Sequence, residues 1–224
     1  MALLFRLGQT VARVDQARGV VFAYDMASPK RARRVRACLQ AEQAATQYSV
    51  FETWLSRGDR AGLISELVSE CDADADSLAV WAPRLSQKVV LNLRDGHTPR
   101  LLVAGVGHSK AATDADPATV WAGCACGVLC YDIKDEDRLR KVRASVVPVA
   151  AAVQRSVYAV RMGWEVLSTL LRSIGEVAAP GDQVWVYPLA HAGDLWRVQS
   201  MPSSLLPVGT GSGWRRVGRE VFVT

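Results

Sequence analysis

The sequence predicts an α+β fold of two tandem ferredoxin-like (βαββαβ) domains. Two observations carry this prediction. The first is an internal repeat, because residues 22–53 align without a gap on residues 129–160. The second is the same alternation in both copies of short apolar runs, typical of strands, with longer stretches that have a helical spacing of apolar residues.

The first strand of each copy is a short apolar run rich in valine and aromatic residues, "GVVFAYD" and "GVLCYD". A helix should follow, starting at Ser28 before Pro29 in the first copy and at Asp135 in the second. Apolar residues at positions i, i+3 and i+7 form one buried stripe on each helix. They are Ala32, Val35 and Leu39 in the first copy, and Leu139, Val142 and Val146 in the second.

The later elements also occur twice. "TQYSVFETW" and "VQRSVYAV" alternate as half-buried strands. Apolar helices are expected around "AGLISELVSEC" and "GWEVLSTLLRSIGEV", and a closing strand follows an aspartate in "DADSLAVWAP" and "GDQVWVYPL". Beyond Thr53 we expect the register between the copies to slip by a few residues.

We place a first ferredoxin-like domain at residues 1–95, a connector with one strand at 96–118, and a second ferredoxin-like domain at 119–224. "KVVLNLRDG" reads as a further strand of the first domain and "RLLVAGVG" as another strand before the second domain. "HSKAATDADPAT" is the polar part of the connector. A Pro/Ser/Gly-rich segment leads to a final tail strand, "REVFVT".

Composition narrows the classes of partner. The net charge of +5 comes mainly from arginine, whose planar fork suits phosphate oxygens, although arginine-rich genomes produce the same bias without any binding. No apolar run approaches the roughly 20 residues that cross a bilayer, so we expect no membrane partner and a cytoplasmic location. The five cysteines lack the spacing of a disulfide framework, which agrees with a reducing compartment.

Four features together resemble the family of CRISPR-associated protein two, the small subunit of the CRISPR adaptation machinery. They are "YD" at the end of the first strand, the basic helix "RARRVR", the strand "QYSVFE" and the closing "DQVWVYPL". The resemblance covers both copies, as a tandem duplication in one chain. The second copy departs from it at Arg155, Tyr158 and Ala159, so Glu52 has no acidic counterpart.

The resemblance implies a DNA-binding scaffold in spacer acquisition, a step of antiviral defence. Family members pair with a second copy, bridge two dimers of the integrase, CRISPR-associated protein one, and lie under the middle of the double-stranded protospacer DNA. The resemblance therefore implies that one duplicated chain replaces that homodimer, with its two ferredoxin-like domains packed as a pseudo-dimer. Members have also been described as metal-dependent nucleases, with the first-strand aspartate as metal ligand.

Asp25 and Asp132 are the candidate catalytic and metal-binding residues. If the two copies pack about a pseudo-twofold axis, both carboxylates could bind one Mg²⁺ ion and activate water against a phosphodiester. The alternative is structural, with each aspartate capping a loop or pairing with an arginine of the next helix. The chain is therefore a scaffold, a Mg²⁺-dependent endonuclease or endoribonuclease, or a toxin-like ribonuclease relative, and its status as an enzyme stays open.

Basic residues on the first helix of each copy are the candidate nucleic-acid contacts. They are Arg31, Arg33, Arg34 and Arg36 in the first copy, and Arg138, Arg140, Lys141 and Arg143 in the second. Two symmetric basic helices would make one long stripe that neutralises phosphates on both ends of a duplex midsection. The alternative is a solvated helix face. The histidines His97, His108 and His191 are given no catalytic role.

Overall fold

The computed structural model describes residues 17–42, 45–47, 50–72, 74–93, 98–107, 112–113 and 115–198, and it confirms the α+β class and both ferredoxin-like repeats. The first repeat consists of β1 (Arg18–Asp25), α1 (Pro29–Ala41), β2 (Ala45–Gln47), β3 (Val50–Leu55), α2 (Arg57–Glu70) and β4 (Ser77–Trp81). The second consists of β8 (Cys126–Asp132), α4 (Glu136–Val146), β9 (Ala150–Gln154), β10 (Val157–Val160), α5 (Trp164–Val177) and β11 (Gln183–Leu189).

The repeats stay in register further than the sequence indicated. Helices α2 and α5 have equal lengths and keep the spacing of the preceding elements, so the expected slip beyond Thr53 is wrong for this helix. The slip falls in the loop before the closing strand, where Asp76 and Asp182 are equivalent. Asp135 caps α4 by accepting a hydrogen bond from the Arg138 amide, whereas the side chain of Ser28 makes no such bond to α1.

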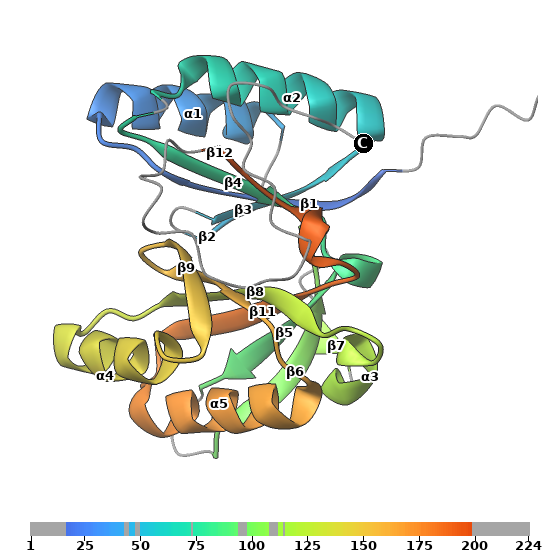
Figure 1. The fold of residues 1–224 in the computed structure, drawn as a ribbon, viewed down its shortest axis with the longest axis vertical. Helices are drawn as coiled ribbons and strands as arrows, with labels where there is room; N and C mark the ends of the chain where they lie inside the picture. The colour runs from blue at the N-terminus through green and yellow to red at the C-terminus, as the bar shows by residue number, and fades with distance from the viewer. Residues whose placement is uncertain are drawn as a thin grey trace, which may run out of the picture.

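Two antiparallel sheets form the centre of the molecule, in the strand orders β12-β4-β1-β3-β2 and β7-β6-β5-β11-β8-β10-β9. The additional elements are β5 (Gln87–Asn92), β6 (Arg100–Gly105), β7 (Ala112–Thr113), α3 (Pro117–Trp121) and β12 (Leu195–Val198). Helices α1 and α2 cover the outer face of the first sheet, and α4 and α5 cover the outer face of the second (Figure 1). The two sheets pack against each other between these helical layers.

The halves exchange strands. The sequence assigned residues 87–92 to the first domain, but β5 pairs with β11, in the sheet of the second half. In return, β12 from the end of the second half pairs with β4. Val89 and Leu91 of β5 belong to the buried core of the second half, which gives the physical reason for this placement. The sheets thus cross the boundaries that were drawn along the sequence.

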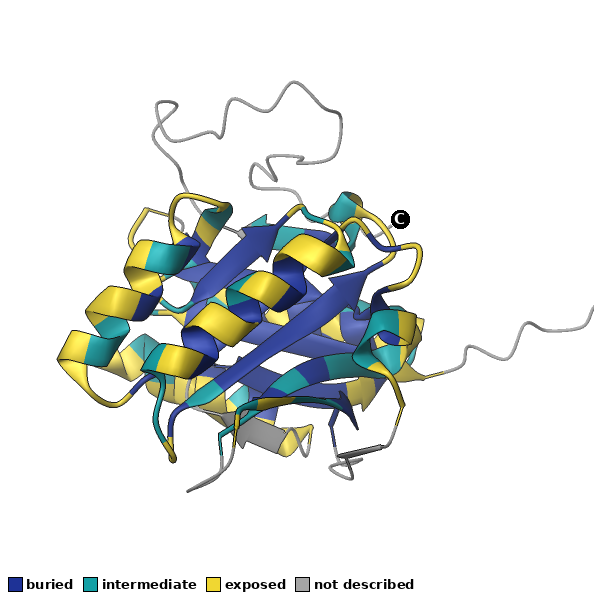
Figure 2. Ribbon diagram, turned by 90° about the horizontal axis from the view of Figure 1, so that it is seen from below, coloured by how far each residue is buried: buried dark blue, intermediate teal, exposed yellow. Residues whose placement is uncertain are grey.

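The core has three parts, one between the two sheets and one between each sheet and its own helices. This division arises because successive side chains of a strand point to opposite faces of the sheet. Val20 and Phe22 of β1 lie under α1 and α2, whereas Val21 and Ala23 face the other sheet. In Figure 2 the strands are mostly buried and the helices expose their outer sides. The contact between the halves is therefore a genuine apolar core.

Some predicted features lie outside the described residues. They are the tail strand "REVFVT", His97, and residues 108–111 and 114 of "HSKAATDADPAT". The described part of that connector segment contains β7 and the beginning of α3. None of the described helices is long and apolar enough to cross a membrane.

Candidate nucleic-acid interface

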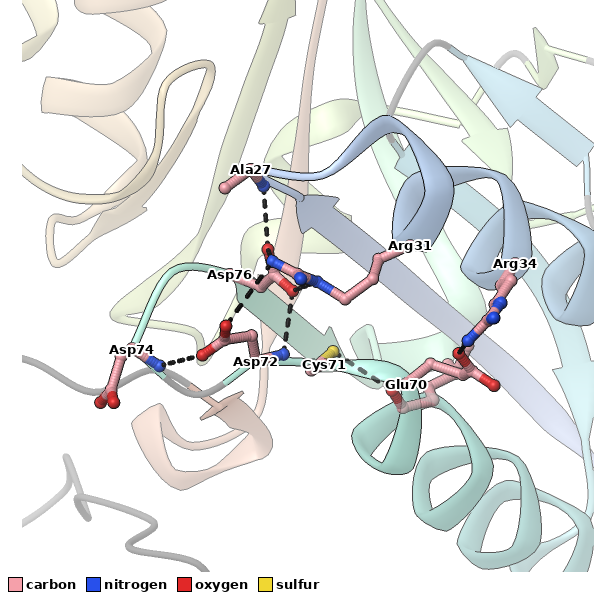
Figure 3. Close-up of polar contacts among 9 residues, drawn as sticks. Ala27, Arg31, Arg34, Glu70, Cys71, Asp72, Asp74 and Asp76 are labelled. Atoms are coloured by element: carbon pink, nitrogen blue, oxygen red, sulfur yellow. Dashed lines mark hydrogen bonds and ion pairs between the residues drawn. The ribbon is translucent and has the colours of Figure 1, made fainter.

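Arg31, at the start of α1, is held in an internal ion pair. Its Nε donates to Asp76 Oδ2 at 2.5 Å and its Nη2 to Asp76 Oδ1 at 3.0 Å (Figure 3). The same carboxylate accepts hydrogen bonds from the backbone amides of Ala27 and Asp72, at 2.8 and 2.9 Å. Burial alone would raise the pKa of Asp76, but the Arg31 guanidinium and these amides lower it below its ordinary value.

The second half repeats this arrangement. Arg138 Nε donates to Asp182 Oδ2 at 2.8 Å and Arg138 Nη2 to Oδ1 at 3.2 Å. The backbone amides of Lys134 and Ala179 also donate to the Asp182 carboxylate, at 3.0 and 2.9 Å. Burial alone would raise the pKa of Asp182, but Arg138 and these amides lower it below its ordinary value. We call these two ion pairs the clamps. Each ties the start of a helix to the loop before the closing strand of its own half.

The clamps reduce the set of side chains that can contact backbone phosphates. Arg31 and Arg138 were predicted to contact nucleic acid, but both bind a carboxylate whose side chain is fully buried. The sequence held a signal for this role, since an aspartate precedes the closing strand in both copies. The six remaining candidates, here called the basic set, are Arg33, Arg34, Arg36, Arg140, Lys141 and Arg143.

All six side chains of the basic set are exposed. Arg34 pairs with Glu70 of α2 at 3.0 Å, and Arg36 donates to the Tyr24 hydroxyl at 3.3 Å. Arg140 pairs with Asp137 at 2.9 Å, although both side chains are about three-quarters exposed, so this contact holds the arginine weakly. Arg33 forms no ion pair within the described part of the chain.

The two groups of the basic set lie on opposite outer layers. Helix α1 is at the top of the molecule in Figure 1 and α4 is at the bottom, with both sheets between them. The set is therefore two separate basic helices rather than one continuous stripe.

The strand-end aspartates have different surroundings. Asp25 is 52% exposed, and its Oδ2 lies 3.9 Å from Nε of Arg155, which belongs to the other half. Asp132 is half-buried, and its Oδ2 has no hydrogen-bond partner among the described residues. Burial, with a smaller contribution from the charge of Asp182, raises the pKa of Asp132 against the opposing charge of Lys134. In the part of the chain that the structure describes, neither aspartate pairs with an arginine of its own following helix.

These two carboxylates fit a Mg²⁺ ion only in part. Strand alternation places both on the faces that look toward the other sheet, as for Ala23 and Cys130. The free Oδ2 of Asp132 is a suitable ligand, but the Arg155 cation beside Asp25 opposes a second cation there. No group of three or more metal-ligating side chains occurs among the described residues. Water would have to supply most ligands, as Mg²⁺ commonly allows.

A family model describes this chain in two segments. The model of CRISPR associated protein Cas2 matches residues 19–88 and residues 126–194, together well over half of the chain. The segments coincide with the two repeats and confirm both the resemblance and the tandem duplication. Among curated proteins, none matches the chain closely enough to count as a relative.

Proposed function

Because the chain belongs to the CRISPR associated protein Cas2 family, which supports a role in CRISPR adaptation, we propose that it is a DNA-binding scaffold subunit of that process. It would bridge dimers of the integrase, CRISPR-associated protein one, and contact the backbone of the double-stranded protospacer. The observation that carries the proposal is the recurrence of exposed basic residues on α1 and α4, at equivalent positions outside the clamps.

The basic set supports backbone contact rather than base reading. Arg33 and Arg36 lie about one helical turn apart, as do their equivalents Arg140 and Arg143. Guanidinium groups so spaced can follow successive phosphates, and such contacts release counterions without distinguishing sequence. We therefore expect duplex affinity to fall steeply with salt and to differ little between sequences.

A paired substitution tests this placement. Arg33→Ala with Arg140→Ala should weaken binding to all duplexes alike, and it should flatten the plot of log K against log salt by roughly 0.9 per lost phosphate contact. Fluorescence anisotropy of a labelled duplex at several salt concentrations measures both quantities. An unchanged slope would contradict the assignment.

Arg57→Ala with Arg172→Ala is the matched control. These arginines are also exposed, and they lie on α2 and α5, so the control removes the same charge from the other helices. It should lower the salt slope less than the paired variant. Equal losses in both variants would show that net charge, and not the basic set, governs binding.

A Mg²⁺-dependent nuclease is the second candidate, and the unpartnered Oδ2 of Asp132 favours it. When bound, Mg²⁺ would polarise a phosphodiester and activate water. As a scaffold, Asp25→Ala with Asp132→Ala should leave spacer integration close to wild type while abolishing any Mg²⁺-dependent cleavage. Collapse of integration in a reconstituted assay, with the variant folded and still binding DNA, would overturn the non-catalytic role.

Assembly gives a further test. Because the two halves pack against each other across an apolar core, one chain can take the place of the usual homodimer. A connector makes such pairing intramolecular, with an effective concentration on the order of millimolar for a short linker. We propose that the complex contains one chain per four integrase subunits. Measurement of the mass of the complex in solution tests this ratio, and two chains per four integrase subunits would contradict it.

A further inference from the structure

Glu52 on β3 is a buried carboxylate between the two sheets, with 6% of its surface exposed. Its Oε1 accepts hydrogen bonds from Lys88 Nζ and from the Tyr187 hydroxyl, each at 2.5 Å. Its Oε2 accepts the Gly107 amide at 2.9 Å. We call these four residues the Glu52 cluster. Lys88 and Glu52 come from the first repeat and its exchanged strand, whereas Tyr187 comes from the second repeat.

The pseudo-symmetric position on the other side of the interface is apolar. The aligned repeats make Ala159 the equivalent of Glu52, and the strand registers make Trp81 and Leu195 the equivalents of Tyr187 and Lys88. All three are buried in the core between the sheets. Trp81 and Tyr187 themselves meet edge to face, with ring centroids 5.5 Å apart. At this pair of equivalent positions, the interface is therefore polar on one side and apolar on the other.

We propose that the surface between the halves is a heterotypic docking surface, on which a first half accepts a second half and rejects a half of its own kind. Two second halves paired together would bury two Tyr187 hydroxyls against alanine side chains, with no carboxylate to accept them. Two first halves would bring two Trp81 rings together where Trp81 now meets the smaller ring of Tyr187, so the core between the sheets would be overpacked. A buried polar group that loses its partner carries its full desolvation cost, and overpacking also costs stability, so both combinations are disfavoured.

Charge and burial agree with this assignment. Lys88 is only 14% exposed and supplies the cation that a buried carboxylate needs. Burial, followed by the negative charge of Glu52, raises the pKa of Tyr187 well above its ordinary value, so the hydroxyl keeps its proton and donates a hydrogen bond to the carboxylate. The inference stands on the interface alone and does not depend on the proposed function.

Cys130 provides a reporter for docking in the full-length chain. It is fully buried in the core between the sheets, so a thiol reagent reaches it only when the halves separate. Native-state labelling with N-ethylmaleimide, followed by peptide mass analysis, gives the rate at Cys130. Tyr187→Phe leaves Glu52 short of a donor, and this rate should rise on the order of ten- to hundredfold.

Tyr158→Phe is the matched control, because it removes the same hydroxyl from a buried tyrosine that hydrogen-bonds to Tyr131 within the second half. Tyr158 packs on the outer face of its sheet, away from the other half. Its labelling at Cys130 should stay near the wild-type rate. Equal acceleration in both variants, or none in Tyr187→Phe, would overturn the proposal.

Exchanging the two sides tests selectivity itself. The triple variant Glu52→Ala, Lys88→Leu, Trp81→Tyr imitates a pair of second halves and should expose Cys130. Adding Ala159→Glu, Leu195→Lys and Tyr187→Trp moves the carboxylate to the other side and should restore most of the protection. A folded six-residue variant that labels as fast as the triple variant would overturn the proposal. If that variant does not fold, the Tyr187 and Tyr158 variants decide alone.

Discussion

The two halves of this protein share their clamps and differ at the ends of their first strands. Arg31–Asp76 and Arg138–Asp182 have the same geometry, down to two backbone amides on each carboxylate. Asp25, by contrast, is exposed and paired across the halves, whereas Asp132 is half-buried, and its Oδ2 lacks a hydrogen-bond partner among the described residues. The duplicated sequence has kept one feature twice and has changed the other.

The difference follows from what each feature contacts. A clamp joins a helix to a loop of the same half, so each half needs its own. The strand ends and inner faces contact the other half, where a change on one side can be matched on the other. Gln154, for example, donates from the second half to the backbone oxygens of Ala23 and Ser77, at 3.0 and 3.2 Å.

The largest expected effect comes from Gly127, whose equivalent in the first half is Val20. A Cβ at Gly127 would lie 2.5 Å from a ring atom of Trp121 and 2.5 Å from the backbone oxygen of Tyr187. Gly127→Ala should therefore lower the free energy of unfolding by about 3 kcal/mol, through overpacking against backbone. Urea denaturation measures the change.

Gly62→Ala is the matched control for this substitution. Gly62 lies within α2, and a Cβ there would meet no atom of the described residues within 4 Å. The same exchange should raise stability by about 0.5–1 kcal/mol, because alanine favours a helix more than glycine does. Equal effects of both substitutions would show that Trp121 and the Tyr187 backbone do not restrict the space at Gly127.

The clamps should respond alike in the two halves. Asp76→Ala and Asp182→Ala each remove a buried acceptor of four hydrogen bonds, and each should cost about 2 kcal/mol of stability at pH 7. Both pKa values are lowered by folding, so the contribution is present above the unfolded value of about 3.9 and is lost as the pH falls through the folded value. A cost confined to one half would contradict the shared role.

Local patterns predicted most of the repeats, because each strand and helix carries its own apolar period and caps. The exchange of β5 and β12 was not predictable, since either sheet offers an equivalent apolar edge to a short strand such as "QKVVLN". Arg31 and Arg138 look like the other helix arginines in sequence, and only the approach of a distant aspartate removes them from the candidate interface. Sequence spacing within a helix carries no information on such long-range partners.

Asp132 should show the opposite pH dependence to the clamps. Folding raises its pKa, so any stabilisation that it gives is present below the unfolded value of about 3.9 and is lost as the pH rises through the folded value. Asp132→Asn removes the charge and should stabilise the protein at pH 7, by no more than about 1 kcal/mol because the residue is only half-buried. Thermal unfolding from pH 3 to 8 follows the difference. A gain that is as large at pH 3 as at pH 7 would contradict this cause.

The smallest effect is expected at the contact between Arg155 and Asp25. Nε and Oδ2 are 3.9 Å apart, and the arginine side chain is 90% exposed, so solvent and salt screen the attraction. Arg155→Ala should change the free energy of unfolding by less than about 0.5 kcal/mol at ordinary ionic strength. Because Arg155 is one of the positions at which the repeats differ, this result would mean that the first half acquired a cationic neighbour for its strand-end aspartate without a stability requirement. If urea denaturation of Arg155→Ala shows a loss of more than about 1 kcal/mol in the free energy of unfolding, and Asp132→Asn shows no such loss, the contact between Arg155 and Asp25 stabilises the fold as the clamps do.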